Sequence, residues 1–230
     1  MNKKKILKHN LSAIGTKVII DSNSKKIRKF IKHECCHLEE AFDMYSEYIA
    51  NWSSFKYFLP TKIDIQDNYL VISQDMHGES VLEKNKLDLA LIKKILDPII
   101  ELCNYAKTNK LYADPHIKNF TIKNGAFKYV DISPPYSKKY NNFVILKAKN
   151  ALEKNILEKN CEYFRWDWLP YHFAGDLLSI NLESITWFDI IFQEVKFLLP
   201  KSIDKNSFYE KAITVRYYED KRSLIGLNLL

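Results

Sequence analysis

Glycine and cysteine are scarce in this sequence, at 5 and 4 residues among 230. No G-x-G-x-x-G loop precedes the first predicted strand, and only segment 12–16 around Gly15 is available to cover a phosphate there. Cys35 and Cys36 are adjacent, and the other two cysteines are isolated. This pattern excludes a disulfide framework, so we expect reduced and mostly buried thiols.

Long apolar runs are also missing. No run reaches about 18 apolar residues, so we expect no transmembrane helix. The basic opening, MNKKKILKHN, lacks the apolar segment of a secretory signal. Together with the cysteine pattern, these features predict a cytoplasmic protein.

Apolar and aromatic residues, in contrast, are plentiful. The chain is 47% hydrophobic, with 14 Tyr, 13 Phe and 4 Trp, which excludes a disordered protein. A chain of 230 residues is long enough to bury a substantial core, either in one large domain or in two small lobes.

Positive charge is concentrated at the start of the chain. Residues 1–32 contain ten Lys or Arg and one Asp, so the remainder contributes −2 to the net charge of +7. Such a region would attract phosphates, nucleic acid or an anionic membrane surface. A solvated lysine-rich face explains the same residues, and both interpretations stay open.

Alternating apolar residues and short polar turns predict strands in the first third of the chain. The runs over 16–21 and 25–32 are joined by a polar turn, which predicts a β-hairpin. Apolar residues at intervals of three and four predict an amphipathic helix over 33–52. After Pro60, the segments TKIDIQ and NYLVISQ predict two more strands.

Helical patterns dominate the rest of the chain. Residues 86–107 predict a long helix with a kink near Pro98. The short strands FTIK and FKYVDI are joined by Asn124-Gly125, a strong hairpin signal. From about Tyr140 the pattern is helical again. This order predicts an α+β fold with a β-rich first third.

The same order predicts two lobes. We expect residues 1–73 to form an N-lobe with a small antiparallel sheet and one main helix. Residues 74–80 would form a hinge, and residues 81–230 a mostly helical C-lobe. Because the connection is short, the lobes should face each other across a cleft, which is a preferred place for a ligand.

The stretch LYADPHIKNFTIKNGAFKYVDISPP, residues 111–135, holds Asp114, Asn119 and Asp131 between apolar runs. Its Asn-Gly hairpin folds the chain back, so Asn119 and Asp131 can share a metal. Carboxylate and amide oxygens are the hard ligands that Mg²⁺ prefers, and a further carboxylate can accept or orient the proton of a hydroxyl. The stretch therefore predicts one site rather than a solvated loop.

This stretch resembles the catalytic loop and metal-binding hairpin of the protein-kinase-like superfamily, most closely its aminoglycoside and choline phosphotransferase branch. The resemblance covers roughly residues 12–135. It implies an ATP- or GTP-dependent phosphotransferase that uses Mg²⁺ and acts on a hydroxyl of a small molecule. It also implies that Asp114 is the catalytic residue and that Asn119 and Asp131 hold the metal.

The resemblance also implies which residues would bind the nucleotide. LVISQDMHGES is similar to the final strand and hinge that hold the adenine, which implies contacts at Ser73, Gln74 and Asp75. The superfamily also pairs a strand lysine with a helix glutamate near the phosphates, and Lys29 and Glu47 match these positions best. The alternatives for this pair are Lys17, Lys26, Lys32 and Glu40.

Two departures from the superfamily pattern favour a small-molecule acceptor, and a third concerns the metal loop. Tyr112-Ala113-Asp114 replaces the H-R-D triplet, so a phosphorylated activation loop would lack its arginine. His116 stands where Ser/Thr protein kinases have a lysine; it could shuttle a proton, bind substrate or support the loop. Residues 132–135, Ile-Ser-Pro-Pro, predict a rigid metal loop.

An aromatic cluster lies where this branch of the superfamily builds its acceptor pocket. Trp166, Asp167, Trp168 and Tyr171 could hold a sugar, a cation or a planar ring through stacking and cation–π contacts. Packing between helices explains the same run, so both interpretations stay open.

The motif HECCH offers a second type of metal site. On a helix, His33 and His37 share one face with Cys36 beside it, which would suit zinc. A fourth ligand is not evident, and buried thiols with surface histidines explain the motif as well.

Other functions stand beside the phosphotransferase. The same fold can sense nucleotide or act as a scaffold without turnover, as in a pseudokinase, or act as an atypical protein kinase. The basic residues 1–32 could instead bind nucleic acid or another anionic partner. The enzyme is favoured because all three polar positions of the expected active centre are present.

Overall fold

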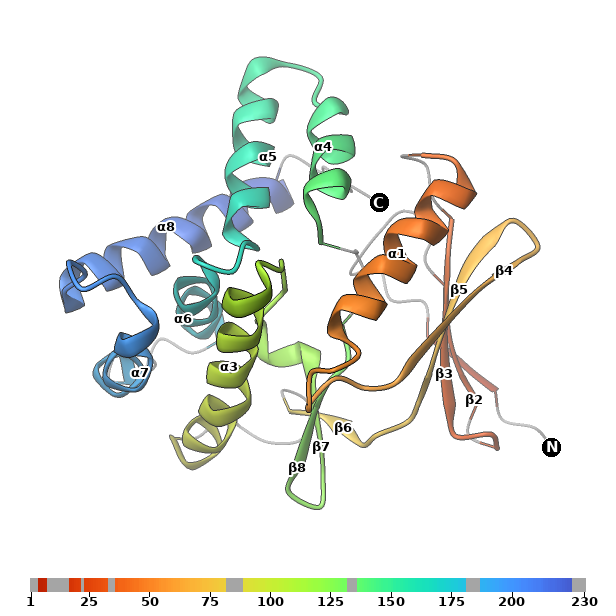
Figure 1. The fold of residues 1–230 in the computed structure, drawn as a ribbon, viewed down its shortest axis with the longest axis horizontal. Helices are drawn as coiled ribbons and strands as arrows, with labels where there is room; N and C mark the ends of the chain where they lie inside the picture. The colour runs from red at the N-terminus through yellow and green to blue at the C-terminus, as the bar shows by residue number, and fades with distance from the viewer. Residues whose placement is uncertain are drawn as a thin grey trace.

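The chain folds into a β-sheet with one helix and a mostly helical part with a small second sheet (Figure 1). This architecture confirms the predicted α+β class. The structure is a computed structural model, and it describes residues 4–7, 17–21, 23–32, 36–81, 89–131, 136–180 and 187–224.

The larger sheet has five antiparallel strands in the order β1-β2-β3-β5-β4. They are β1 (Lys4–Leu7), β2 (Lys17–Asp21), β3 (Lys26–Ile31), β4 (Thr61–Gln66) and β5 (Tyr69–Asp75). The predicted β2–β3 hairpin is present, and the two strands predicted over TKIDIQ and NYLVISQ pair as a second hairpin. The Asp21 carboxylate accepts backbone N–H groups in the β2–β3 turn. Asp67 and Asn68 both have positive φ in the β4–β5 turn, as a type I′ turn requires.

Helix α1 (Leu38–Trp52) packs against strands β4 and β5. Its buried side chains recur at helical spacing and are Ala41, Met44, Tyr45, Tyr48 and Trp52. The sequence predicted a start at residue 33, but the helix begins after His37, whose N–H donates to the Glu40 carboxylate. This contact between the residue before the helix and the third residue of its first turn sets the helix start.

The second part begins with β6 (Glu79–Ser80), which pairs with the hairpin of β7 (Phe120–Lys123) and β8 (Ala126–Tyr129). Asn124 and Gly125 both have positive φ, so the predicted turn is confirmed. The helices are α3 (Leu89–Asn109), η1 (Ile117–Asn119), α4 (Lys138–Leu146), α5 (Ala151–Tyr163), α6 (Leu169–Ile180), α7 (Phe188–Val195), η3 (Lys196–Leu198) and α8 (Lys205–Leu224). Helix α3 continues through Pro98, where the sequence predicted a kink.

One hydrophobic core joins the two parts. Trp52, at the end of α1, is fully buried, and its ring centroid lies 5.3 Å from that of Tyr105 and 5.9 Å from that of Tyr129. The backbones meet as well, since Tyr129 N–H donates to Tyr57 C=O and Leu59 N–H donates to Tyr129 C=O. The segment before β4 is therefore fixed against β8, the strand that leads into the predicted site.

The connection between the two parts passes through Gly78, which has a φ of +147°. A Cβ at this position would lie 2.4 Å from the backbone oxygen of Ile122 in β7. We expect Gly78→Ala to lower the free energy of unfolding by about 3 kcal/mol, because backbone strain and this clash act together. Urea unfolding measures the loss.

Gly125→Ala provides the matched control. Gly125 also has a positive φ, +79°, but an added Cβ there would meet no atom within 4 Å. Only the conformational cost of about 1 kcal/mol is expected. Equal losses in the two variants would contradict the role of close approach at Gly78.

Candidate functional site

The loop after α3 carries Asp114 and is held in place through its backbone. Lys110, with a φ of +57°, ends the helix in the left-handed conformation. Ala113 N–H then donates to Phe164 C=O at 2.9 Å. The Tyr129 hydroxyl contacts both backbone groups of Asp114, at 3.2 Å from the nitrogen and 3.1 Å from the oxygen.

Asp114, Asn119 and Asp131 converge, as the sequence predicted. All three are buried, with exposed fractions of 5%, 8% and 8%. Asn119 Nδ2 donates to Asp131 Oδ2 and to the backbone oxygen of Asp114, each at 3.2 Å. The β7–β8 hairpin makes this possible because it returns the chain to Asn119, whose backbone oxygen accepts Val130 N–H.

Lys29 of β3 reaches this group from the larger sheet, with its ammonium nitrogen 3.9 Å from Asp131 Oδ1. Its predicted partner Glu47 is exposed, and no ion pair joins the two in the described part of the chain. The helix register is the reason, since α1 buries Tyr48 and turns Glu47 to solvent.

Burial, with the charge of Asp131, raises the pKa of Tyr48 well above its usual value. The sequence also offered other residues for this lysine–glutamate pair. None of them forms an ion pair within the described part of the chain; they are Lys17, Lys26, Lys32 and Glu40.

Both carboxylate oxygens of Asp114 are engaged. Oδ1 accepts the His116 backbone N–H at 3.1 Å and contacts His116 Nδ1, while Oδ2 accepts the Tyr136 hydroxyl at 3.3 Å. Burial acts to raise the pKa of Asp114, but the charge and hydrogen bond of His116 lower it far below its usual value. Asp114 is therefore an ionised carboxylate at neutral pH.

His116 connects Asp114 to two further acids, the buried Asp176 and the partly buried Glu219. Its Nε2 lies 3.2 Å from Glu219 Oε1 and 3.5 Å from Asp176 Oδ1. Burial alone would lower the pKa of His116, but the three surrounding carboxylates raise it well above its ordinary value of 6.5. Asp176 also accepts Ile117 N–H at 3.0 Å, so the same acid fixes the backbone of the loop.

His172 of α6 completes the network. Its Nε2 lies 2.8 Å from Glu219 Oε1, and its ring centroid lies 4.8 Å from that of His116. Helix α8, which carries Glu219, approaches α6 closely at Gly175, where a Cβ would lie 2.7 Å from the backbone oxygen of Ala212. A larger residue at this crossing would hold Glu219 away from the histidines.

Asp114, His116 and His172 could hold a metal ion, because one ligand atom from each lies within 4.8 Å of the others in a buried position. Both imidazoles, however, already use both ring nitrogens. His172 Nδ1 lies 3.1 Å from Tyr163 C=O, and the Nε2 atoms of both rings face Glu219. A metal at this position would have to displace these contacts.

The predicted magnesium ligands offer oxygen atoms instead. Asn119 uses Nδ2 for both of its side-chain hydrogen bonds, so its amide oxygen has no partner among the residues that the structure describes. Asp131 adds a carboxylate beside it. Hard oxygen donors of this kind suit Mg²⁺, so this pair fits the ion that the resemblance implies.

The three residues predicted to contact the adenine have different surroundings. Ser73 and Gln74 lie within β5, between β3 and β4. The buried Gln74 side chain donates to Thr61 Oγ1 at 2.9 Å and to Val130 C=O at 3.2 Å, so it joins the sheet to the residue before Asp131. Asp75 is exposed at the end of β5, where the chain leaves the sheet.

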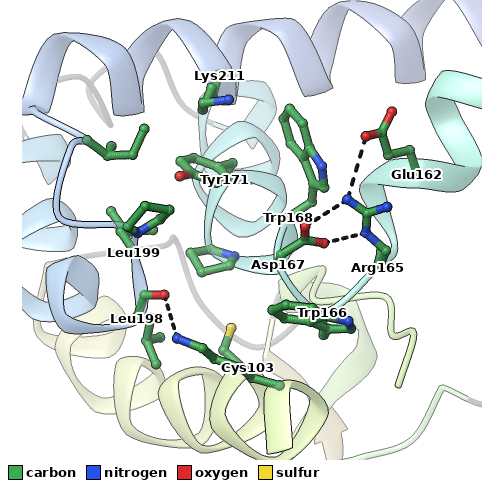
Figure 2. A pocket seen from close by; sticks show the side chains of 14 residues that line it. Cys103, Glu162, Arg165, Trp166, Asp167, Trp168, Tyr171, Leu198, Leu199 and Lys211 are labelled. Carbon is green, nitrogen blue, oxygen red and sulfur yellow. Dashed lines mark hydrogen bonds and ion pairs between the residues drawn. The ribbon is translucent and has the colours of Figure 1, made fainter. Parts of the chain in front are cut away.

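The predicted substrate residues are divided between two places. His116 is part of the acidic network, whereas Trp166, Asp167, Trp168 and Tyr171 line a pocket of about 510 Å³ between α3, α6, η3 and α8 (Figure 2). Phe164 lies between the acidic network and the pocket. Its ring stacks on Tyr136 and packs against His172 on the side of the network, and the next residue, Arg165, lines the pocket.

Other predicted features fall wholly or partly outside the described residues. The Gly15 segment, His33, Cys35 and residues 132–135 are among them. The HECCH motif is described only at the half-buried Cys36 and the exposed His37. The basic region 1–32 is described in strands β1 to β3 and the β2–β3 turn.

Sequence reasoning missed His172, Asp176 and Glu219. The first two were accessible to it, since a histidine and an aspartate four positions apart on the apolar helix LPYHFAGDLLSI share one buried face. Glu219 carried no such signal, because α8 is rich in charged residues throughout.

Comparison with protein-family models finds no family that matches this chain, and comparison with curated proteins finds no matching relative. Across the described residues, the helices are all too short or too polar to cross a bilayer.

Proposed function

We propose that this protein is a phosphotransferase that moves the terminal phosphoryl group of ATP or GTP to a hydroxyl of a small molecule. The observation that carries the proposal is the buried group of Asp114, Asn119 and Asp131, joined by the Asn119 amide and faced by Lys29. Phosphoryl transfer needs positioning and charge neutralisation more than covalent help. Asp114 could position a hydroxyl, and the charge of the phosphates would be neutralised by Lys29 and by a Mg²⁺ ion on Asn119 and Asp131.

In this proposal Asp114 orients the attacking hydroxyl. His116 keeps the pKa of the Asp114 carboxyl far below its usual value. Asp114 is therefore a weak base, which accepts a hydrogen bond more readily than a proton. The hydroxyl would take the place of Tyr136 on Oδ2, the oxygen that His116 does not hold. The proton would pass to the Asp114 carboxylate late, after the new bond to phosphorus has made the acceptor hydroxyl acidic, and the nucleoside diphosphate would leave with the electrons of the broken P–O bond.

Asn119 and Asp131 would hold Mg²⁺, which supplies charge neutralisation for the nucleotide phosphates when bound. Lys29 would contact the phosphates from β3, since its ammonium already faces the same carboxylate. The adenine or guanine would lie against the connection 76–78, because the backbones of Ser73 and Gln74 are within the sheet.

We also propose that the acceptor is a small molecule and that the enzyme acts in the cytoplasm. The acceptor proposal rests on the missing H-R-D arginine and on His116 at the position of the protein-kinase lysine. The compartment is supported by Cys103 and Cys161, which are buried and unpaired thiols, as in a reducing environment.

Thermal unfolding with ATP or GTP, each with and without Mg²⁺, tests the nucleotide site. Mg-nucleotide should raise the apparent stability by about 2.7 kcal/mol at a hundredfold excess over Kd. Asp131→Ala should abolish this increase, because it removes a metal ligand. Asp97→Ala, at an exposed position on α3, is the matched control and should keep it. An increase that persists in Asp131→Ala would contradict the assignment.

A second candidate is a nucleotide-binding module without turnover. The fully engaged Asp114 carboxylate favours it, because His116 and Tyr136 leave no oxygen free for a substrate hydroxyl in this conformation. The thermal increase with Mg-nucleotide would then be present without any formation of ADP or GDP.

A further inference from the structure

We propose that the tryptophan pocket, formed by Trp166, Trp168, Tyr171, Lys211 and the Arg165–Asp167 pair, is a second binding site, for a sugar that carries a phosphate or carboxylate group. The site is separate from the Asp114 group and does not depend on phosphoryl transfer. The pocket has the size, the aromatic walls, the cations without a carboxylate partner and the hydrogen-bonding pair that such a ligand needs.

The size and walls suit a small organic ligand. The cavity measures about 510 Å³, within the range of roughly 300–1,000 Å³ for ligand pockets. Trp166 and Trp168 lie on either side of the Arg165–Asp167 pair (Figure 2) and are only half-buried, unlike the fully buried Trp52. A lysine lies over each indole, with Lys110 Nζ 3.9 Å from the ring centroid of Trp166 and Lys211 Nζ 4.6 Å from that of Trp168. A sugar would therefore stack on the ring surface that these lysines leave open.

Two lysines give the pocket its positive charge. Lys211 Nζ lies 4.6 Å from the ring centroid of Trp168 and 5.5 Å from that of Tyr171. Lys107 Nζ donates to Leu198 C=O at 3.2 Å. Neither ammonium has a carboxylate partner in the described part of the chain, so a bound anion would supply the missing counter-charge.

The Arg165–Asp167 pair distinguishes a sugar from a simple anion. Arg165 Nε and Nη2 donate to the two carboxylate oxygens of Asp167 at 2.6 and 2.7 Å, and Glu162 lies 3.7 Å from the guanidinium. The pair presents donors and acceptors side by side, which matches neighbouring hydroxyl groups of a sugar. A bare phosphate would gain nothing from the tryptophans and would be repelled by the two carboxylates.

Tryptophan fluorescence tests the proposal directly, because two of the four tryptophans line the pocket. The probes are glucose 6-phosphate, glucuronate, glucose, inorganic phosphate and AMP, titrated at constant ionic strength. We expect saturable changes with glucose 6-phosphate and glucuronate, and affinities at least about tenfold weaker for glucose or phosphate alone, since each lacks one recognised feature.

Lys211→Gln should weaken binding of glucose 6-phosphate by about tenfold, because it removes a charge-assisted contact while leaving the fold intact. Lys201→Gln removes an exposed lysine outside the pocket and should leave the affinity unchanged. Asp131→Ala should also bind the sugar normally, so a failed nucleotide site and a failed sugar site give different results.

Three outcomes would overturn the proposal. They are no saturable change with either anionic sugar, equal affinity for inorganic phosphate alone, and an affinity that Lys211→Gln does not alter. Tighter binding of AMP than of both anionic sugars would likewise replace the sugar with a nucleotide as the ligand.

Discussion

Asp114→Asn is expected to lower nucleotide turnover by about 10²–10⁴-fold, the usual effect of losing a catalytic carboxylate. The substitution keeps the size of the side chain and removes the charge that orients the acceptor hydroxyl. It also removes the charge that His116 contacts through Nδ1. Binding of Mg-nucleotide should change little, because Asn119, Asp131 and Lys29 are retained.

Release of ADP or GDP from Mg-nucleotide, with water and with a panel of hydroxyl compounds, measures this effect. Asp43→Asn, an exposed site on α1, is the control and should turn over as the wild type does. Turnover that survives in Asp114→Asn would exclude the assigned role. No turnover in the wild type, despite nucleotide binding, would favour the module without catalytic activity.

Glu219→Ala is expected to lower the free energy of unfolding by about 3–5 kcal/mol, because it leaves two buried histidines without their shared acid. Glu219 is 12% exposed and contacts the Nε2 atoms of both His116 and His172. Although burial acts to raise its pKa, the two histidines lower it well below the ordinary value of 4.5. Urea unfolding at constant pH measures the loss, and Glu210→Ala, exposed on the same helix, should lose far less.

The same network predicts how stability depends on pH. The raised pKa of His116 means that its contribution is complete below about 6.5 and is lost as the pH rises through the raised value. The lowered pKa of Glu219 means that its contribution is present above about 4.5 and is lost as the pH falls through the lowered value. Both contributions are complete between these limits, so the network stabilises the fold most at mildly acidic pH.

Glu219→Gln should flatten the decline in stability above pH 6.5, since one of the charges that raises the pKa of His116 is gone. Unfolding free energies measured from pH 5 to pH 9 for both proteins check this. The same slope in wild type and variant would show that Glu219 does not interact with a charged His116.

Features of the fold and the site that depend on nearby residues were predictable from the sequence. The Asn124-Gly125 turn has the backbone conformation that this dipeptide favours, and it returns the chain toward Asn119. Asn119 and Asp131 can therefore meet through 12 residues of local chain. The same locality explains why the β2–β3 hairpin and the strands β4 and β5 were correctly predicted.

Features that depend on helix register and on distant contacts were not predictable. Glu47 and Tyr48 are neighbours in sequence, and only the packing of α1 decides which of them is buried. Glu219 reaches His172 across 47 positions, through a helix crossing at Gly175 that no local pattern reveals. The pocket around Trp168 likewise needs η3 and α8 to close it.

The position of Glu219 on α8 has a consequence for synthesis on the ribosome. Because Glu219 follows His172 by 47 positions, translation at roughly 5–20 residues per second delays its arrival by about 2–9 s after His172. During that interval His116 and His172 have no Glu219 carboxylate to face. The loop that carries Asp114 is therefore made before α8 and acquires its final electrostatic environment only when α8 emerges and docks.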